Sequence, residues 1–192
     1  MSATTATDGR DGRYDGFVVV AAMAALMWVL EIVDQVAGGD LDGWGIRPRD
    51  PDRLIGVVTA PFLHAGFGHL IGNTVPFLVL GGVIAFNGAA RVLAVTGIVM
   101  LVGGLGVWLV ASEHSLHIGA SGVVFGYAAY LVARGAFNRS AGELAVGAVV
   151  AAIWGSALLS GLVPRDGISW QGHLFGAIGG IVAAAVLRRD RA

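Results

Sequence analysis

The sequence predicts an all-α membrane protein built as a bundle of six transmembrane helices. Hydrophobic residues make up 56% of the 192 residues and charged residues only 13%, whereas soluble domains carry about 25% charged residues. The apolar residues fall into six segments, each near the ~20 residues that a helix needs to cross the hydrocarbon core of a bilayer. Helix is the expected conformation because lipid offers no hydrogen-bond partner to a free backbone.

These segments define one membrane domain over residues 17–188. Its helices are expected at about 17–37, 67–87, 91–111, 119–136, 142–162 and 170–188. Residues 1–16 are polar and are expected to form a disordered cytoplasmic tail, and residues 189–192 form a second tail. Only the connection between the first two segments is long. It is rich in Gly, Pro and charge, and Trp44 is expected to anchor it at the interface.

The arginines predict how the bundle is oriented. With a cytoplasmic N-terminus, the inner side holds Arg10, Arg13, Arg91, Arg134, Arg139, Arg188, Arg189 and Arg191, and the outer side holds Arg47, Arg49, Arg53 and Arg165. This excess favours cytoplasmic termini. All 12 basic residues are arginine and 31 residues are glycine, which suggests a GC-rich genome and therefore the cell membrane of a bacterium.

Composition also argues against several classes of site and partner. The chain has no cysteine, which excludes disulfides, thiolate metal sites and a cysteine nucleophile. The net charge of −1 and the lack of a basic cluster predict no nucleic-acid partner. No metal or cofactor is expected, because His64, His69 and Asn73 come without a matching set of carboxylates or thiolates.

The notable polar residues of the apolar region lie at the starts of three segments. These residues are His69 and Asn73, Ser121, and His173. The second, fourth and sixth segments all run from outside to inside, so these side chains are expected on one side of the membrane. Counting from the first inner arginine at ~1.5 Å per residue puts Ser121 and His173 at similar depths, about 10 Å below the outer boundary.

Glycines predict that the fourth and sixth segments touch. Gly122 and Gly126 are four residues apart on one, and Gly172, Gly176 and Gly180 repeat the spacing on the other. Such stripes let helix backbones approach closely. Ser121 adjoins the first stripe and His173 the second, so a hydroxyl and an imidazole are expected within hydrogen-bond reach, as base activation of a serine requires.

Simpler interpretations exist for each residue. Ser121 can be a small packing residue, and His173 can be a structural donor or part of a transport path. Phe125, Tyr127 and Tyr130 are interpreted as packing aromatics, and His114 and His117 as solvated loop residues. Glu31 and Asp34 are expected at an interface or facing a polar interior.

Three motifs together resemble the rhomboid intramembrane serine proteases in their minimal six-helix form, over about residues 17–188. They are "GASG" at 119–122, "GHLFGAIGG" at 172–180 and "HAGFGHLIGN" at 64–73. The resemblance implies a rhomboid-like fold in which Ser121 is the nucleophile and His173 the general base. It also implies that His69, Asn73 and the backbone N–H of Ser121 bind the oxyanion. Supporting roles fall to His64, Gly119, Gly122, Phe125, Gly176 and Gly180.

Two positions depart from the family pattern. Phe125 stands where many members carry a tyrosine that stacks on the histidine, and it keeps the ring face. The family's Trp-Arg pair in the first outer loop is not intact, and Trp44 and Arg47 are the nearest candidates.

The implied activity is a serine endopeptidase that opens to the outer side of the membrane. Its substrates would be single-pass transmembrane proteins, cut near the outer boundary after a small residue. The bilayer is the other partner, and the oligomeric state is left open. The alternatives are an inactive relative that binds membrane clients and a small transporter. Inverted repeats or paired broken helices would favour transport, and neither is seen.

Overall fold

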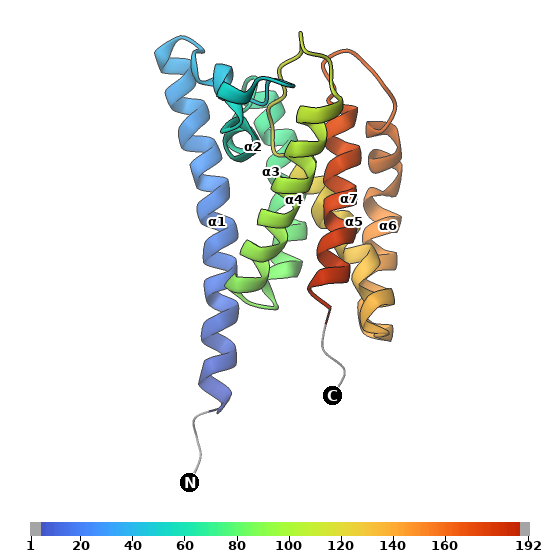
Figure 1. Ribbon diagram of the computed structural model, residues 1–192. Coiled ribbons are helices and arrows are strands. Elements are labelled where there is room, and N and C mark those ends of the chain that lie inside the picture. The colour runs from blue at the N-terminus through green and yellow to red at the C-terminus, as the bar shows by residue number, and fades with distance from the viewer. Residues whose placement is uncertain (1–4, 189–192) are drawn as a thin grey trace.

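The computed structural model describes residues 5–188, and its long elements are all helices. Six helices form the bundle in Figure 1: α1 (Thr5–Ala37), α3 (Phe67–Ala85), α4 (Ala89–Val110), α5 (Ser121–Asn138), α6 (Ala141–Gly161) and α7 (Trp170–Val186). Within the described residues, extended pairing is limited to two isolated bridges, one of which joins Ile46 to His117. The predicted all-α bundle is confirmed.

The expected helix boundaries agree with the structure except at the first helix. Every expected end from residue 67 onward lies within two residues of the observed one. The first helix instead begins at Thr5, so the prediction of a disordered tail is wrong for residues 5–16. One reason is packing, because a Cβ on Gly16 would lie 2.7 Å from the carbonyl oxygen of Ala85. The lower part of α1 therefore rests on the end of α3. Residues 1–4 and 189–192, the ends of the two expected tails, lie outside the described residues.

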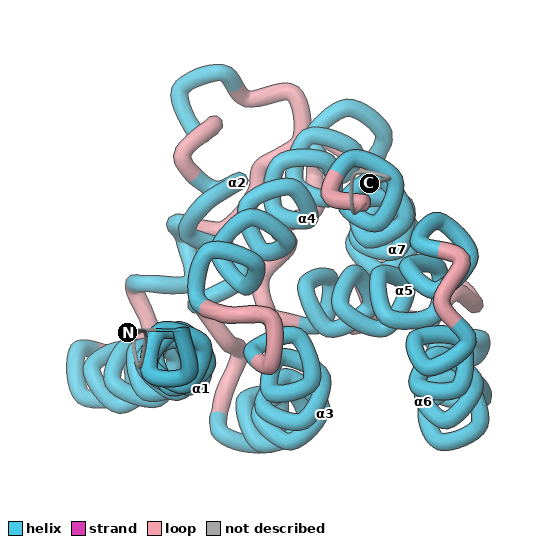
Figure 2. Tube along the Cα trace, turned by 90° about the horizontal axis from the view of Figure 1, so that it is seen from below, coloured by secondary structure: helices cyan, strands magenta, loops and turns pink. Residues whose placement is uncertain are grey.

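Four of the helices are long and apolar enough to cross a membrane, namely α1, α3, α4 and α6. The apolar helix α7 is shorter, and α5 is not among the four. Figure 2 shows why α5 differs: it lies inside the bundle, in contact with α3, α4, α6 and α7. Its neighbours cover it, so it can carry the buried polar side chains of Tyr127, Tyr130 and Arg134.

Apolar side chains both fill the core and cover the outside. The core includes Leu70, Phe77, Val95 and Leu131, each at most 1% exposed. Large apolar side chains also point outward on several helices, including Val29, Leu101, Leu109, Val149 and Ile153. A soluble protein seldom exposes such extended apolar surface, whereas a multi-pass membrane protein presents it to lipid.

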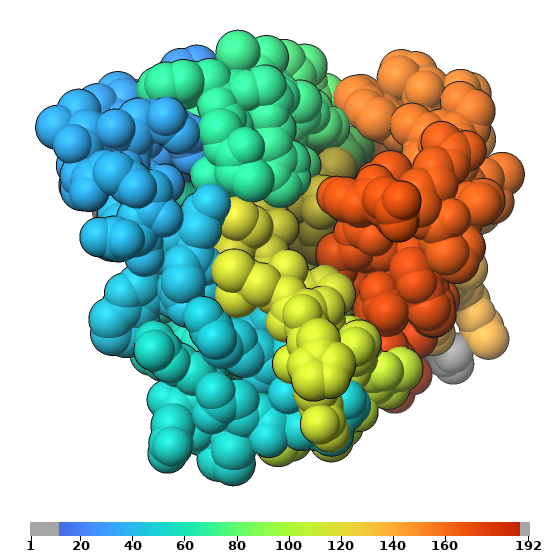
Figure 3. Space-filling model, turned by 90° about the horizontal axis from the view of Figure 1, so that it is seen from above, coloured from blue at the N-terminus to red at the C-terminus, as the bar shows by residue number. Residues whose placement is uncertain are grey.

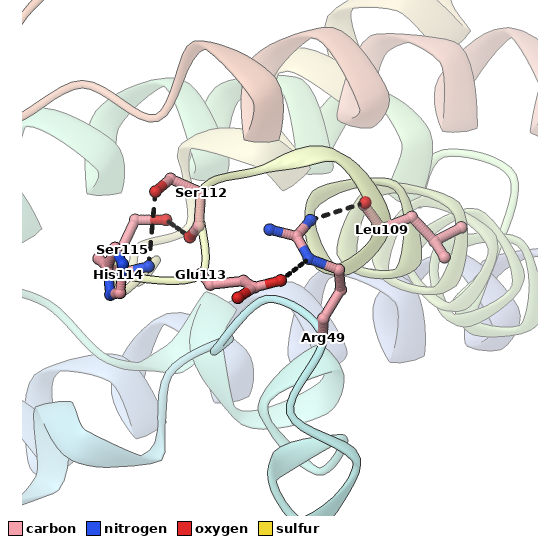
Figure 4. Close-up of polar contacts among 6 residues, drawn as sticks. All are labelled: Arg49, Leu109, Ser112, Glu113, His114 and Ser115. Carbon is pink, nitrogen blue, oxygen red and sulfur yellow. Dashed lines mark hydrogen bonds and ion pairs between the residues drawn. The ribbon is translucent and has the colours of Figure 1, made fainter.

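The long connection after α1 folds into short turns that sit over one end of the bundle. They are η1 (Leu41–Trp44), η2 (Pro51–Arg53), α2 (Gly56–Thr59) and η3 (Ala60–Phe62). Arg49 holds this connection, since its guanidinium contacts the Glu113 carboxylate at 2.7 Å and donates to the Leu109 carbonyl at 3.0 Å (Figure 4).

Two residues expected near an interface are in fact buried. Glu31 and Asp34, near the end of α1, are 2% and 4% exposed. The Gln35 amide donates to Glu31 at 3.0 Å, and the backbone N–H of Leu41 donates to Asp34 at 2.7 Å. Of the two earlier interpretations, the polar interior is the one observed.

Candidate active site

The starts of α3, α5 and α7 meet at one end of the bundle, the upper end in Figure 1. A cavity of about 770 Å³ opens there, and its lining includes His69, Asn73, Ser121 and His173. Figure 3 looks down on this end, where the segment before α5 (yellow) lies between α3 (green) and α7 (orange-red). Polar residues from three distant parts of the sequence therefore share one cavity.

The Ser121 hydroxyl and the His173 imidazole lie within hydrogen-bond distance. Nε2 of His173 is 2.9 Å from Oγ of Ser121. Nδ1 of His173 is 2.7 Å from the carbonyl oxygen of Gly161, at the end of α6. A carbonyl only accepts, so Nδ1 carries the proton, and Nε2 of the neutral ring is left to accept from the serine hydroxyl.

The glycine stripes bring these two side chains together. A Cβ on Gly176 would lie 2.1 Å from the carbonyl oxygen of Gly122, and one on Gly180 would lie 2.0 Å from that of Gly126. Cβ atoms do not approach oxygen so closely, so the contact requires glycine at these positions. The expected close packing of the two helices is observed.

Phe125 lies flat against the histidine. The Phe125 and His173 rings are 4.0 Å apart at their centroids and 7° from parallel. The phenylalanine therefore restricts rotation of the imidazole, as expected from its ring face. The sequence had also allowed Phe125 to be an ordinary packing aromatic. Its stacking partner is His173.

Gly161 is a site residue that the sequence analysis missed. Besides accepting from His173, it leaves no room for a side chain, since a Cβ would lie 2.5 Å from Cζ of Phe125 and 2.9 Å from Nδ1 of His173. The sequence offers no signal for this role, because a glycine at a helix end is common.

His69 and Asn73 lie on one face of α3, beside Gly119. A Cβ on Gly119 would lie 2.5 Å from Cε1 of His69 and 3.7 Å from Nδ2 of Asn73, and the residue has φ +109°. Both the space and the backbone angle therefore favour glycine. The Asn73 amide uses one donor on the His69 carbonyl, at 3.2 Å, and an amide nitrogen has two.

His64 supports the loop that leads to Ser121. Its Nε2 accepts from the backbone N–H of Ala120 at 3.3 Å, and the side chain is 1% exposed. Burial, together with the neighbouring His69, lowers the pKa of His64 to about 4. The ring is therefore neutral at physiological pH, as an acceptor must be.

His117 was interpreted as a solvated loop histidine, and this interpretation is wrong. Its ring nitrogens lie 2.7 Å from Oγ of Ser169 and 2.8 Å from Oγ of Ser115. Burial lowers the pKa of His117. Ser169 was missed, although a serine just before an apolar segment is a recognisable helix cap. His114 is exposed, as expected.

Trp44 and Arg47, the nearest candidates for the family's Trp-Arg pair, lie in the connection between α1 and α3, and within the described residues they do not pair with each other. The guanidinium of Arg53, not that of Arg47, lies over the Trp44 ring, 5.5 Å from its centroid. The loop's ion pair comes from Arg49 (Figure 4).

Comparison with known proteins identifies the family of the chain. Residues 51–190 match the model of the rhomboid domain. The chain is 42% identical to the uncharacterized protein Rv1337 of Mycobacterium tuberculosis, over 96% of this chain and 80% of that protein. It is 41% identical to the uncharacterized protein ML1171 of Mycobacterium leprae, over 90% and 71%. It is also 30% identical to YdcA of Bacillus subtilis, whose name proposes a rhomboid protease, over 93% and 92%. The chain therefore belongs to the rhomboid family of multi-pass membrane proteases.

Proposed function

We propose that this protein is an intramembrane serine endopeptidase that works with a dyad of Ser121 and His173. The observation that carries the proposal is the hydrogen bond from the serine hydroxyl to a histidine whose other nitrogen is occupied. Nε2 lies 2.9 Å from Oγ, and Nδ1 lies 2.7 Å from a backbone carbonyl. A base held in the correct tautomer against a hydroxyl is the arrangement that activates a serine.

In this mechanism His173 takes the proton of Ser121 as Oγ attacks the carbonyl carbon of the scissile peptide. The same nitrogen then returns the proton to the leaving amine, which gives an acyl-enzyme on Ser121. Water, activated by His173, hydrolyses the ester. The Gly161 carbonyl takes the place that a carboxylate holds in a triad, since it fixes the orientation of the ring.

The negative oxygen of the tetrahedral intermediate needs donors near Ser121. The side chains of His69 and Asn73 line the same cavity as the serine, and the Ser121 N–H lies in the first turn of α5, where amides lack intrahelical acceptors. We assign these three groups to the oxyanion. Loss of one such donor typically lowers kcat by about 10²- to 10³-fold.

Substrates in this proposal are single-pass transmembrane proteins cut near the outer membrane boundary. A helical peptide bond has its carbonyl occupied within the helix, so the substrate must present a locally unwound segment. The cavity at the end of the bundle offers both water and space for an extended backbone. By the arginine excess, this end faces outward and the termini face the cytoplasm.

The test is cleavage of a single-pass reporter in liposomes that contain the purified protein. The parent should cut the reporter, and Ser121→Ala and His173→Ala should not. A fluorophosphonate probe should label the parent on Ser121. Ser156→Ala, which removes an exposed serine on α6, is the matched control and should behave as the parent. Equal cleavage by the parent and Ser121→Ala would refute the proposal, and a folded parent without any cleavage or labelling would favour a client-binding relative.

A further inference from the structure

A second pair of serine and histidine links the segments that lead into α5 and α7, above the first pair. His117 precedes Ser121 by four residues, and Ser169 precedes His173 by four. Nδ1 of His117 lies 2.7 Å from Oγ of Ser169, next to the 2.9 Å contact between His173 and Ser121. The two contacts are crossed, because each of the two segments supplies one serine and one histidine.

The hydrogen bonds around His117 have a defined direction. The Ser115 hydroxyl donates to the Ser112 carbonyl at 2.5 Å (Figure 4), so its oxygen accepts from Nε2–H of His117 at 2.8 Å. Nδ1 of the neutral ring must then accept from the Ser169 hydroxyl. The Ser169 oxygen in turn caps α7 by accepting from the backbone N–H of Gly172 at 3.1 Å. The hydroxyls of Ser115 and Ser169 therefore each donate one hydrogen bond and accept another, and the two ring nitrogens of His117 take opposite roles.

The backbone on the α5 side of this link is firmly held. His117 exchanges two backbone hydrogen bonds with Ile46, at 2.9 and 3.0 Å, and the N–H of Gly119 donates to Ala60 at 2.9 Å. The α7 side is held lower down, where the Gly122 and Gly176 backbones touch. Ser121 and His173 therefore lie between two attachments, the glycine contact below and the His117–Ser169 contact above.

We propose that His117 and Ser169 are positioning residues that hold the first turn of α7 against the segment before α5, and so keep His173 within reach of Ser121. The inference rests on the proposed function, because it concerns the reaction of the same dyad. Helix ends fray readily, and a displacement of 1 Å in a catalytic group can cost about 10²-fold in rate. The upper contact prevents that displacement at the N-terminus of α7.

Two substitutions of His117 distinguish its contact with Ser169 from its contact with Ser115. The Asn side chain places an acceptor near the position of Nδ1, whereas the longer Gln side chain reaches toward the position of Nε2. His117→Asn should therefore keep the contact with Ser169, and His117→Gln should keep only the contact with Ser115. The measurement is the rate of Ser121 labelling by a fluorophosphonate, resolved into binding (KI) and reaction (kinact). We expect kinact to fall about 10- to 100-fold in His117→Gln, with KI unchanged, and to recover in His117→Asn.

Ser169→Gly provides the partner variant. Glycine is an adequate N-cap, within a few tenths of a kcal/mol of serine, so α7 should stay folded while the hydroxyl is lost. Its kinact should match that of His117→Gln, and the double variant should be no slower than either single one. Thermal unfolding in detergent identifies any variant that is slow because it is unfolded. Ser169→Thr keeps the hydroxyl and should therefore react at the parent rate.

The outcomes separate the inference from the proposed function. A parent protein that the probe does not label at Ser121 refutes the proposed function. If the parent is labelled and His117→Gln reacts at the parent rate, the positioning role is overturned. Equal slowing in His117→Asn and His117→Gln also overturns it, because the contact with Ser169 would then not be the one that matters.

Discussion

At the scale of single residues, the sharpest prediction concerns substitution of Gly161. Gly161→Ala places a methyl group against Cζ of Phe125 and Nδ1 of His173, at 2.5 and 2.9 Å. The imidazole must then move away from Ser121, so labelling of Ser121 should slow at least about tenfold, and overpacking should cost about 1–3 kcal/mol of stability. Gly155→Ala on the same helix is the control, because its Cβ would meet nothing within 4 Å. A Gly161→Ala protein that is labelled as fast as the parent would contradict the role assigned to this glycine.

Asp42, which lines the active-site cavity, predicts a dependence of stability on pH. Burial and the nearby carboxylates of Asp34 and Glu31 raise the pKa of Asp42 to about 6. A raised folded-state pKa means that the folded protein binds the proton more tightly than the unfolded chain does. Stability should therefore fall as the pH rises from about 4 through 6. Asp42→Asn should unfold at a higher temperature than the parent at pH 7.5, and the difference should vanish near pH 4. An equal difference at both pH values would exclude Asp42 as its cause.

The roles of some single residues could be predicted from the sequence, and the roles of others could not. Ser121 and His173 could be paired because both adjoin glycine stripes and both start segments of the same direction. His117 could not, since a histidine in a polar loop has no periodic pattern that indicates burial, and its partner Ser169 is 52 residues away. The same holds for Gly161, whose role depends on a carbonyl oxygen and so is invisible in the side-chain pattern.

At the scale of helices, the packing of α5 against α7 should matter far from the reacting atoms. Gly180 lies two turns below His173, and a Cβ there would lie 2.0 Å from the carbonyl oxygen of Gly126. Gly180→Ala should therefore push the helices apart, lower the unfolding temperature and slow labelling of Ser121. Gly97→Ala on α4, where a Cβ has open space, should change neither measurement. If Gly180→Ala and Gly97→Ala behaved alike, the glycine contact would not be what holds the dyad.

The positions of the helices are the part of the structure that the sequence predicted best. Length and hydropathy place the ends of α3, α4, α6 and α7 because lipid demands an apolar, fully hydrogen-bonded segment of fixed length. The same reasoning failed at α1, whose polar beginning is helical although composition gave no reason to extend it. The contact of Gly16 with Ala85 that holds this part of α1 is tertiary, and a pattern along one segment cannot reveal it.

At the scale of the whole molecule, the charge distribution predicts the orientation in the membrane, and this prediction can be tested directly. The chain has no cysteine, so one introduced thiol is a unique label. His114 lies in the loop beside the active-site end and is exposed, while Asn87 is exposed in the loop at the opposite end. With the arginine-rich side in the cytoplasm, a membrane-impermeant maleimide applied to intact cells should label His114→Cys, whereas Asn87→Cys should be labelled only after lysis. The reverse pattern would turn the active site toward the cytoplasm, and substrates would then have to be cut at their inner boundary.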